Sequence, residues 1–336
     1  MRLTGLDMAR FLAYCGMVLV NFRLAAGVTG TGDLPSVLTD GLEGRAAALF
    51  VVLAGIGLGL GRGDRVEIFR RALFLFGIGL LNLTIFEADI LHFYALYFLC
   101  ALPVLRASSG VLWATMGGLL LVSVAAHAVL NYDAHWNWET LHYQDFWTLR
   151  GFLLHSFFNG WHPVLPWLGF VLIGLWLGRL ELGSARVQWR LILWGTAAAL
   201  LGALPAQLIT DPELLPLFDT AMIPPGPTYM IAASGSAVAV IGLILRVAPR
   251  IEASGLAPWL VAPGRQALSL YILHIVVGMG LLEAFGRLDG SLSPSAIFGL
   301  SLLFCLASAT YARLWARWSK MGPLEALMRR MTTRRN

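Results

Sequence analysis

About ten stretches of mostly apolar residues, each close to the length that crosses a lipid bilayer, run through this chain of 336 residues. A helix needs roughly 20 consecutive apolar residues to span the hydrocarbon core. Only helices and closed barrels satisfy their backbone hydrogen bonds in that environment. The stretches are unbroken and leucine-rich, without the alternation of barrel strands. The sequence therefore predicts an all-α polytopic membrane protein.

The apolar stretches predict about ten transmembrane helices. Their ranges are 8–27, 45–61, 71–86, 89–105, 111–130, 162–179, 190–209, 227–247, 266–286 and 295–316. An even number of crossings would place both termini on the same side of the membrane. We expect residues 1–320 to form a single transmembrane helical domain and residues 321–336 to form a basic cytoplasmic tail.

Basic residues are distributed very unevenly between the two sets of loops. Of the 24 lysine and arginine residues, 19 fall on the loops and ends that share a side with the termini. The other five are Arg10, Arg23, Arg45, Arg150 and Arg287. Because cytoplasmic loops carry an excess of basic residues, this bias predicts cytoplasmic termini, most simply in the plasma (inner) membrane. No basic run is interleaved with aromatic residues, so we expect no nucleic-acid partner.

Four groups of polar residues interrupt the apolar stretches, where charged side chains are costly and usually mark function. The first group lies on one face of the first predicted helix, because its members are three or four residues apart. It contains Asp7, Arg10, Tyr14, Met17 and Asn21. This stripe could form a structural ion pair near the inner surface, or it could be the polar wall of an internal cavity.

The second group surrounds a tight turn on the outer side and contains Asn82, Glu87, Asp89 and His92. Asp89 is a suitable N-cap for the following helix, and His92 would then lie in its first turn. A carboxylate close to an imidazole orients the ring and raises its basicity, which is the arrangement of a general base. The alternative interpretation is a helix cap with an interfacial histidine.

The two remaining groups lie at the outer end of 162–179 and within 266–286. His162 precedes Pro163, so its backbone is biased toward an extended conformation off the helix end, where it is a second candidate base or an interfacial histidine. The fourth group contains Arg265, Gln266, Ser269, Tyr271 and His274. Here His274 is either a hydrogen-bonded packing element or a relay or acyl-contact residue. No HExxH and no paired CxxC occurs, so we expect no metal site.

Four motifs resemble those of YeiB-type membrane proteins, relatives of heparan-alpha-glucosaminide N-acetyltransferase in the transmembrane acyltransferase superfamily. They are RLTGLDMARFLAYCGMVLVN at 2–21, FRRALFLFGIGLLNLTIFEADILHFYALYFL at 69–99, HPVLPWLGFVLIGLWLGR at 162–179 and GRQALSLYILHIVV at 264–277. Two departures limit the resemblance. Phe11 stands where the opening motif has glycine. Residues 28–44 lack the luminal histidine of the animal enzyme, so an acyl-histidine at that place is not expected.

The resemblance implies a membrane acyltransferase that moves an acyl group, most simply acetyl, from cytoplasmic acyl-CoA to an extracytoplasmic acceptor. Arginine forks hold phosphate well. For acyl-CoA binding we expect Arg10, Arg70, Arg71, Arg106, Arg179, Arg265, Ser269 and Tyr271. For the acceptor, a sugar or other small molecule or glycan, we expect Asn21, Arg45, Glu87 and His274. As the general base we expect His92 oriented by Asp89, with His162 second.

Two other classes of function stay open at this point. Buried arginine, aspartate and histidine residues also fit the pathway of a small-solute transporter or exporter without covalent chemistry. Broken helices and an inverted repeat would favour that class. A non-catalytic partner subunit is the third class. Membrane lipids are expected partners of any such chain, and the acceptor, the acyl chain length and a homo-oligomeric state are left open.

Overall fold

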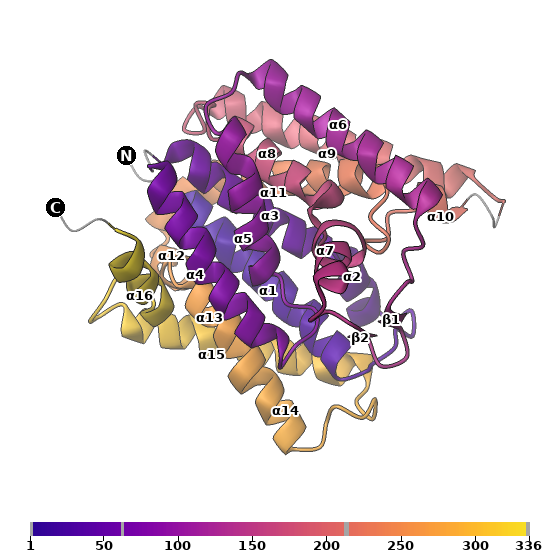
Figure 1. Cartoon of the computed structure of the whole chain (residues 1–336). Helices are drawn as coiled ribbons and strands as arrows, with labels where there is room; N and C mark the ends of the chain where they lie inside the picture. Colours follow the sequence, from indigo (N-terminus) through magenta and orange to yellow (C-terminus); the bar gives the residue numbers. More distant parts are fainter. Residues whose placement is uncertain (1–2, 62–63, 212–214, 334–336) are drawn as a thin grey trace. The chain divides into compact units, whose positions relative to one another are not determined.

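The computed structural model is almost entirely helical (Figure 1), and it describes residues 3–61, 64–211 and 215–333. The α-helices are α1 (Thr4–Ala25), α2 (Leu34–Leu42), α3 (Arg45–Leu60), α4 (Arg65–Leu83), α5 (Leu91–Ala101), α6 (Ser109–Val129), α7 (Leu149–Leu154), α8 (Val164–Leu177), α9 (Ala185–Leu208), α10 (Leu215–Phe218), α11 (Pro227–Ala253), α12 (Ala257–Gly264), α13 (Ala267–Leu273), α14 (Gly280–Ala284), α15 (Pro294–Trp315) and α16 (Pro323–Thr332). A 3₁₀ turn, η1 (Leu102–Val104), and two π-helical turns, η2 (His155–Asn159) and η3 (His274–Met279), continue some of them. Two short strands, β1 (Trp136–Asn137) and β2 (His142–Tyr143), form a hairpin.

Within the described ranges, seven helical stretches are long and apolar enough to cross a membrane. They are Thr4–Ala25, Leu34–Leu60, Ser109–Val129, Ala185–Leu208, Pro227–Ala253, Ala267–Ala284 and Pro294–Trp315. A bent pair, Leu149–Asn159 and Val164–Leu177, meets at 51° and would be an eighth span. The prediction of a polytopic helical membrane protein is therefore confirmed.

Two of the predicted spans are helices that fall short of this criterion. The first half of α4 carries Glu67, Arg70 and Arg71, which keep it from being an uninterrupted apolar span. The apolar helix Leu91–Val104, formed by α5 and η1, is about 21 Å long at 1.5 Å per residue. That length is well below the roughly 30 Å of a hydrocarbon core. The count of ten crossings remains a prediction.

The chain divides into two compact units, and the first comprises Met1–Phe50, Glu181–Thr196 and Ser236–Arg329. In this unit α1 packs against α2, α12, α13 and α15. Met8 of α1 lies in an apolar cluster with Ala248 and Val261. The approach of α12 to α1 requires a glycine, because a Cβ on Gly264 would overlap the backbone carbonyl of Asp7. Helix α1 is thus held on several sides.

The second unit comprises Val51–Leu180, Ala197–Gly235 and Arg330–Asn336. Here α4 and α5 form an antiparallel helical hairpin (Figure 1), and both α5 and α6 pack on α8. Trp167 of α8 is fully buried, with its ring 5.1 Å from Phe170 and 5.9 Å from Tyr229. The ring of Trp167 also lies 4.6 Å from that of His162, and this contact connects α8 to the segment that precedes it.

The aromatic-rich segment between α6 and α7, residues 130–148, is held to the π-turn η2. The indole of Trp136 donates a hydrogen bond of 2.6 Å to the carbonyl of Asn159. The side-chain amide of Asn159 donates in turn to the carbonyls of Tyr132 and Ala134, at 3.0 and 2.8 Å. The hydroxyl of Tyr132 donates to the carbonyl of Gly160 at 2.8 Å. The loop is therefore an ordered part of the second unit.

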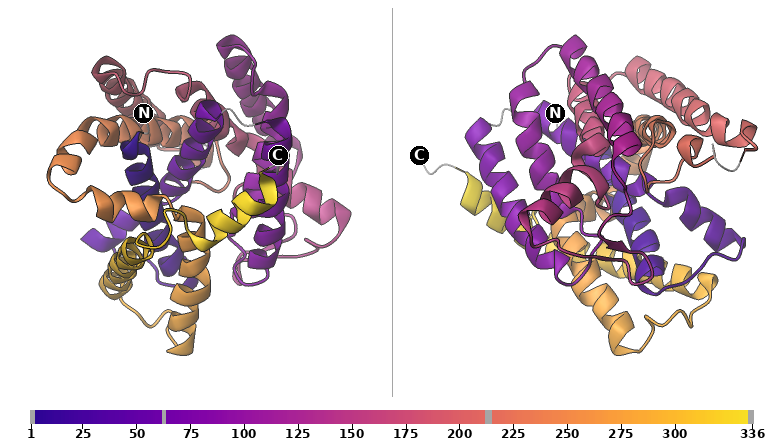
Figure 2. Two further views of the ribbon diagram at one scale, coloured as in Figure 1. Left: turned by 90° about the vertical axis from the view of Figure 1, so that its left-hand side faces the viewer. Right: turned by 45° about the vertical axis from the view of Figure 1, so that its right-hand side comes forward.

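The predicted basic tail contains helix α16 (yellow in Figure 2), which Glu325 attaches to the first unit. The Glu325 carboxylate accepts the backbone N–H groups of Leu268 and Ser269, at 2.7 and 3.2 Å, and the hydroxyl of Ser269 at 2.5 Å. The backbone N–H of Leu324 donates to the same hydroxyl at 2.9 Å. Burial raises the pKa of Glu325, and the hydrogen bond from Ser269 opposes that shift.

We expect Glu325→Ala to release α16. Each hydrogen bond to a charged group contributes roughly 1.5 kcal/mol or more, so trypsin should cleave at Arg329 and Arg330 roughly tenfold faster. Glu283→Ala, which removes an exposed carboxylate of α14, is the matched control and should leave the cleavage rate unchanged. Equal rates for the wild type and Glu325→Ala, measured by gel or mass spectrometry, would show that other contacts hold the tail.

Candidate functional site

Asp89 and His92 form a buried dyad at the turn between α4 and α5, and neither side chain is exposed. The Oδ2 atom of Asp89 accepts the backbone N–H groups of Leu91 and His92, at 2.8 and 3.2 Å. The same oxygen lies 3.1 Å from Nδ1 of His92. The other oxygen of Asp89 accepts a 2.7 Å hydrogen bond from the amide of Asn82. The predicted carboxylate–imidazole contact is confirmed. The N-cap residue of α5 is Ile90 and not Asp89, although the Asp89 carboxylate still accepts two N–H groups of the first turn.

The contacts of Asp89 determine which nitrogen of His92 carries the proton. A carboxylate oxygen that already receives two backbone N–H groups acts as an acceptor, so Nδ1 of His92 donates to it. The other ring nitrogen, Nε2, is left with its lone pair. Nε2 is buried, and no described residue offers it a hydrogen-bond partner. This is the arrangement of an imidazole base whose tautomer is fixed by a carboxylate.

His155 is a further buried histidine beside this dyad, and the sequence analysis missed it. Its ring centroid lies 5.6 Å from that of His92, 5.3 Å from Phe93 and 4.6 Å from Tyr143. Neither ring nitrogen has a hydrogen-bond partner among the residues with described positions. His155 also begins the π-turn η2, and such turns are frequent at functional sites. A lone histidine within the apolar run LLHSFF was the available signal.

His162 completes the cluster. It precedes α8, as the sequence predicts, and its ring lies 4.6 Å from Trp167 and 5.9 Å from Phe93. Because Phe93 contacts His155 as well, the predicted bases His92 and His162 belong to one aromatic group. In the described part of the chain, no three histidine, cysteine, aspartate or glutamate side chains are placed to hold a metal ion.

Two contacts join this cluster to the hairpin β1–β2. Burial raises the pKa of Tyr143 to about 12, so its phenol keeps its proton and donates to Oδ1 of Asn159 at 2.9 Å. The imidazole Nδ1 of His142 lies 2.5 Å from the carboxylate of Glu87 on the α4–α5 turn. Glu87, which we expect to bind the acceptor, is therefore already engaged by a neighbouring side chain.

A second cluster of polar side chains lies in the first unit and contains Asn21, Tyr271 and His274. The ring of His274 donates through Nδ1 to the carbonyl of Tyr271, so its Nε2 accepts from the amide of Asn21 at 3.1 Å. His274 begins the π-turn η3, just as His155 begins η2. The hydroxyl of Tyr14 lies 2.8 Å from that of Ser308 in the same unit. The predicted polar stripe of α1 thus faces other polar side chains.

Asp7 links the first and fourth motifs of the sequence. One of its oxygens lies 2.6 Å from the guanidinium of Arg10, and the other lies 3.3 Å from Nε of Arg265. Asp7 is buried, whereas about a quarter of each arginine side chain is exposed. The interpretation as an ion pair is confirmed, with a second arginine added. Ser269, which we expect to contact acyl-CoA, instead contacts Glu325 in this structure.

The other predicted CoA-binding arginines lie in the second unit, at the end of the α4–α5 hairpin away from His92. Arg70 and Arg106 are exposed and form no ion pair with any described residue. Arg71 pairs with Glu67. Arg179 donates to the carbonyls of Ala107 and Leu105, at 2.6 and 3.2 Å.

The acceptor residues predicted from the sequence are divided between the two units. Arg45 begins α3 in the first unit, where Asn21 and His274 also lie. Glu87 belongs to the second unit together with the histidine cluster.

Comparison with known proteins gives two family matches. Residues 2–209 match the family described as heparan-alpha-glucosaminide N-acetyltransferase, catalytic, and residues 176–335 match the family described as protein of unknown function (DUF418). No curated protein and no solved structure matches the chain. The first match covers more than half of the 336 residues and includes the Asp89–His92 dyad and His155. The chain therefore belongs to the heparan-alpha-glucosaminide N-acetyltransferase family, together with its YeiB-type relatives, as its own motifs predict.

Proposed function

We propose that this protein is a membrane acyltransferase that moves an acetyl group from cytoplasmic acyl-CoA to an amine or hydroxyl outside the cell membrane. The buried Asp89–His92 dyad, with a free lone pair on Nε2 of His92, is the observation that carries the proposal. Membership of an N-acetyltransferase family supports it. The proposal includes ten membrane crossings, cytoplasmic termini and a place in the plasma membrane, which the arginine bias favours.

In the proposed reaction, the acceptor nitrogen or oxygen attacks the thioester carbonyl carbon while Nε2 of His92 takes the acceptor's proton. The carbon–sulfur bond then breaks, and the CoA thiolate recovers that proton from His92. Asp89 holds the ring in the required tautomer and stabilises the imidazolium. The products are the acylated acceptor and free CoA.

For the CoA phosphates we propose the arginines whose guanidinium groups are least engaged by the protein. Arg70 and Arg106 meet this condition in the second unit. Guanidinium forks bind phosphate through paired hydrogen bonds.

We expect Arg70→Gln to weaken acetyl-CoA binding by roughly tenfold, because one charge-assisted contact is lost. Arg71→Gln should have a smaller effect, because Glu67 already occupies that guanidinium. Arg287→Gln, in an exposed loop on the predicted outer side, is the control and should bind normally. Titration calorimetry of the detergent-purified protein provides the measurement. Unchanged affinity in both Arg70→Gln and Arg71→Gln would place the donor site elsewhere.

The whole proposal has a direct first test. A ligand that binds only the folded protein raises its melting temperature. We expect acetyl-CoA to raise the melting temperature more than an equal concentration of inorganic phosphate or glucosamine. Acetyl-CoA mixed with glucosamine should then yield free CoA thiol in proportion to acetylated product. A protein that neither binds nor consumes acetyl-CoA is not an acyl-CoA-dependent transferase.

One observation favours a small-solute transporter as the second candidate. The pair Leu149–Asn159 and Val164–Leu177 is bent by 51°, and broken helices mark the binding sites of many transporters. The two candidates differ in stoichiometry, since a transporter leaves its solute chemically unchanged. Uptake of unmodified solute into proteoliposomes, without thioester cleavage, would support the transporter.

A further inference from the structure

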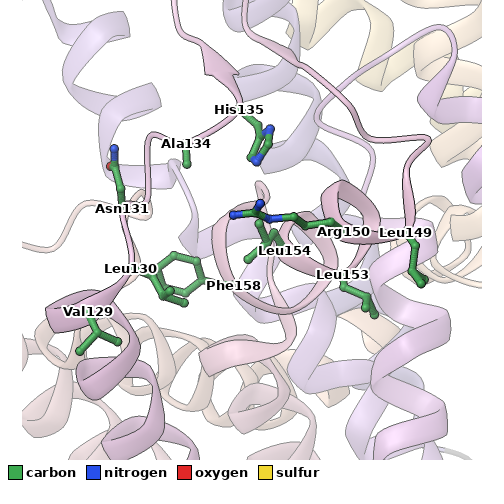
Figure 3. Close-up of a pocket in the computed structure, with 10 residues that line it drawn as sticks. All are labelled: Val129, Leu130, Asn131, Ala134, His135, Leu149, Arg150, Leu153, Leu154 and Phe158. Carbon is green, nitrogen blue, oxygen red and sulfur yellow. The ribbon is translucent and has the colours of Figure 1, made fainter.

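A pocket of about 700 Å³ opens beside the histidine cluster, within the second unit (Figure 3). Its walls come from the end of α6, the loop that follows α6, helix α7 and the π-turn η2. Seven of its ten lining residues are apolar, and among these Leu130, Leu154 and Phe158 form much of the floor. None of the site residues predicted from the sequence lines this pocket.

Two basic side chains stand above this apolar floor. Figure 3 shows the guanidinium of Arg150 and the imidazole of His135 facing the same space, above Leu154 and Phe158. The ring nitrogen Nδ1 of His135 lies 3.4 Å from a carboxylate oxygen of Asp145, so His135 is partly engaged. Arg150 forms no ion pair with the described residues. A cation above an apolar cavity is complementary to a molecule with an anionic group and a hydrocarbon chain.

The position of the pocket agrees with a molecule taken from the membrane. The candidate span Ser109–Val129 ends at the pocket wall, and the bent pair begins at Leu149 on the other wall. The ends of spans lie at the depth of the lipid headgroups. Trp136, Trp138 and Trp161, which contact one another nearby, are typical of that depth. A lipid in the pocket would thus have its charged group level with Arg150.

Aromatic side chains connect the pocket to the dyad. His135, which lines the pocket, has its ring 5.8 Å from Tyr143. The ring of Tyr143 lies 4.6 Å from His155, and that of His155 lies 5.6 Å from His92. Leu154 and Phe158 of the pocket belong to the same short helical segment as His155. Two rings, those of Tyr143 and His155, therefore lie between His135 at the pocket and the proposed base.

We propose that this pocket binds the acyl acceptor, and that the acceptor is an anionic lipid with a free hydroxyl or amine on its headgroup. The inference rests on the proposed acyltransferase function. It adds the chemical class of the acceptor: an apolar chain lies on the floor of the pocket, and Arg150 binds the anionic group. The hydroxyl or amine of the headgroup, which is the nucleophile, then lies on the side of the lipid nearest His155 and His92.

The binding test uses the full chain in a neutral detergent and follows its melting temperature with added lipid. The probe is dioleoylphosphatidylglycerol, with dioleoylphosphatidylcholine and inorganic phosphate as comparison arms. We expect the anionic lipid to stabilise the wild type most. Arg150→Gln should lose at least half of that shift, whereas Arg287→Gln, the matched outer arginine, should keep it. An equal shift in wild type and Arg150→Gln, or an equal shift with phosphate alone, overturns the proposal.

A second variant tests the apolar floor separately from the charge. Ala134→Trp should fill the pocket and abolish the lipid-induced shift. The backbone carbonyl of Ala134, which accepts from Asn159, would be retained. If this variant does not fold, the comparison of Arg150→Gln with Arg287→Gln still decides the matter. A folded Ala134→Trp protein with a normal lipid shift would contradict the assignment.

The transfer test separates the two proposals. With acetyl-CoA present, the wild type should acetylate the anionic lipid, and Arg150→Gln should do so at least several-fold more slowly. Transfer to soluble glucosamine but not to the lipid would overturn the acceptor assignment and leave the acyltransferase function standing. Absence of acetyl transfer to either acceptor would overturn the acyltransferase function. In that case the melting-temperature result alone would show whether the pocket binds the lipid.

Discussion

Replacement of His92 by glutamine should lower acetyl transfer by about 10²- to 10⁴-fold, the usual contribution of a general base. Glutamine fills a similar volume but cannot take a proton from the acceptor. Because Asp89 keeps its bonds to the backbone N–H groups of Leu91 and position 92, the turn itself should stay folded. The measurements are release of CoA thiol and acetylation of the acceptor, with the melting temperature as the check on folding.

Asp89→Asn should also reduce turnover by at least about tenfold, because a neutral amide no longer stabilises the imidazolium that forms when His92 takes the acceptor's proton. His127→Gln is the matched control. His127 belongs to the same unit, and its Nδ1 bonds to the carbonyl of Ser123, away from the dyad. Near-normal turnover by His92→Gln would exclude the dyad from the chemistry. A large fall in melting temperature would instead assign the loss to folding.

Gly79→Ala should destabilise the protein by about 2 kcal/mol or more, because overpacking forces neighbouring backbone apart. A Cβ at this position would overlap the backbone nitrogen of His92. Two residues earlier on the same helix, a Cβ on Gly77 would have no neighbour within 4 Å. Gly77→Ala should therefore stabilise the helix slightly, by about 0.5–1 kcal/mol. The melting temperatures of the two variants in one detergent give the comparison.

The same pair of variants reports on the site. If α4 moves away from α5 in Gly79→Ala, the backbone of His92 moves with it, and acetyl transfer should fall together with stability. Gly77→Ala should retain full turnover. Equal melting temperatures for the two variants would show that α4 and α5 are less closely packed than in this structure.

The parts of the site that the sequence predicted are local in the chain. Asp89 and His92 are three residues apart across a helix start, so capping rules alone bring the carboxylate to the ring. The fold class was equally predictable, since apolar length is the dominant signal in a membrane protein. The number of membrane crossings was less predictable from the sequence. Charges in α4 and the shortness of α5 blur the distinction between a spanning helix and a buried one.

The parts that the sequence could not predict depend on contacts between distant segments. His155 has a role only because Phe93, Tyr143 and His92 surround it, and these come from two other places in the chain, helix α5 and strand β2. Its own neighbours LLHSFF are compatible with an ordinary interfacial helix. The contact of Glu325 with Ser269 joins residues that are 56 apart in the chain, and no periodic pattern in the sequence predicts it. Ring and hydrogen-bond partners of this kind require the folded structure.

The triad of Asp7, Arg265 and the close-packed Gly264 has a consequence for exchanging segments between relatives. The carboxylate lies in the first family match, whereas Gly264 and Arg265 lie in the second. A chimera that inherits α1 from one parent and α12–α13 from another can acquire a side chain at position 264 that overlaps the backbone of residue 7, or lose the arginine at position 265 that pairs with Asp7. We expect a hybrid to fold only when α1 and the α12–α13 segment come from the same parent. These two segments, one from each family match, therefore have to be exchanged together.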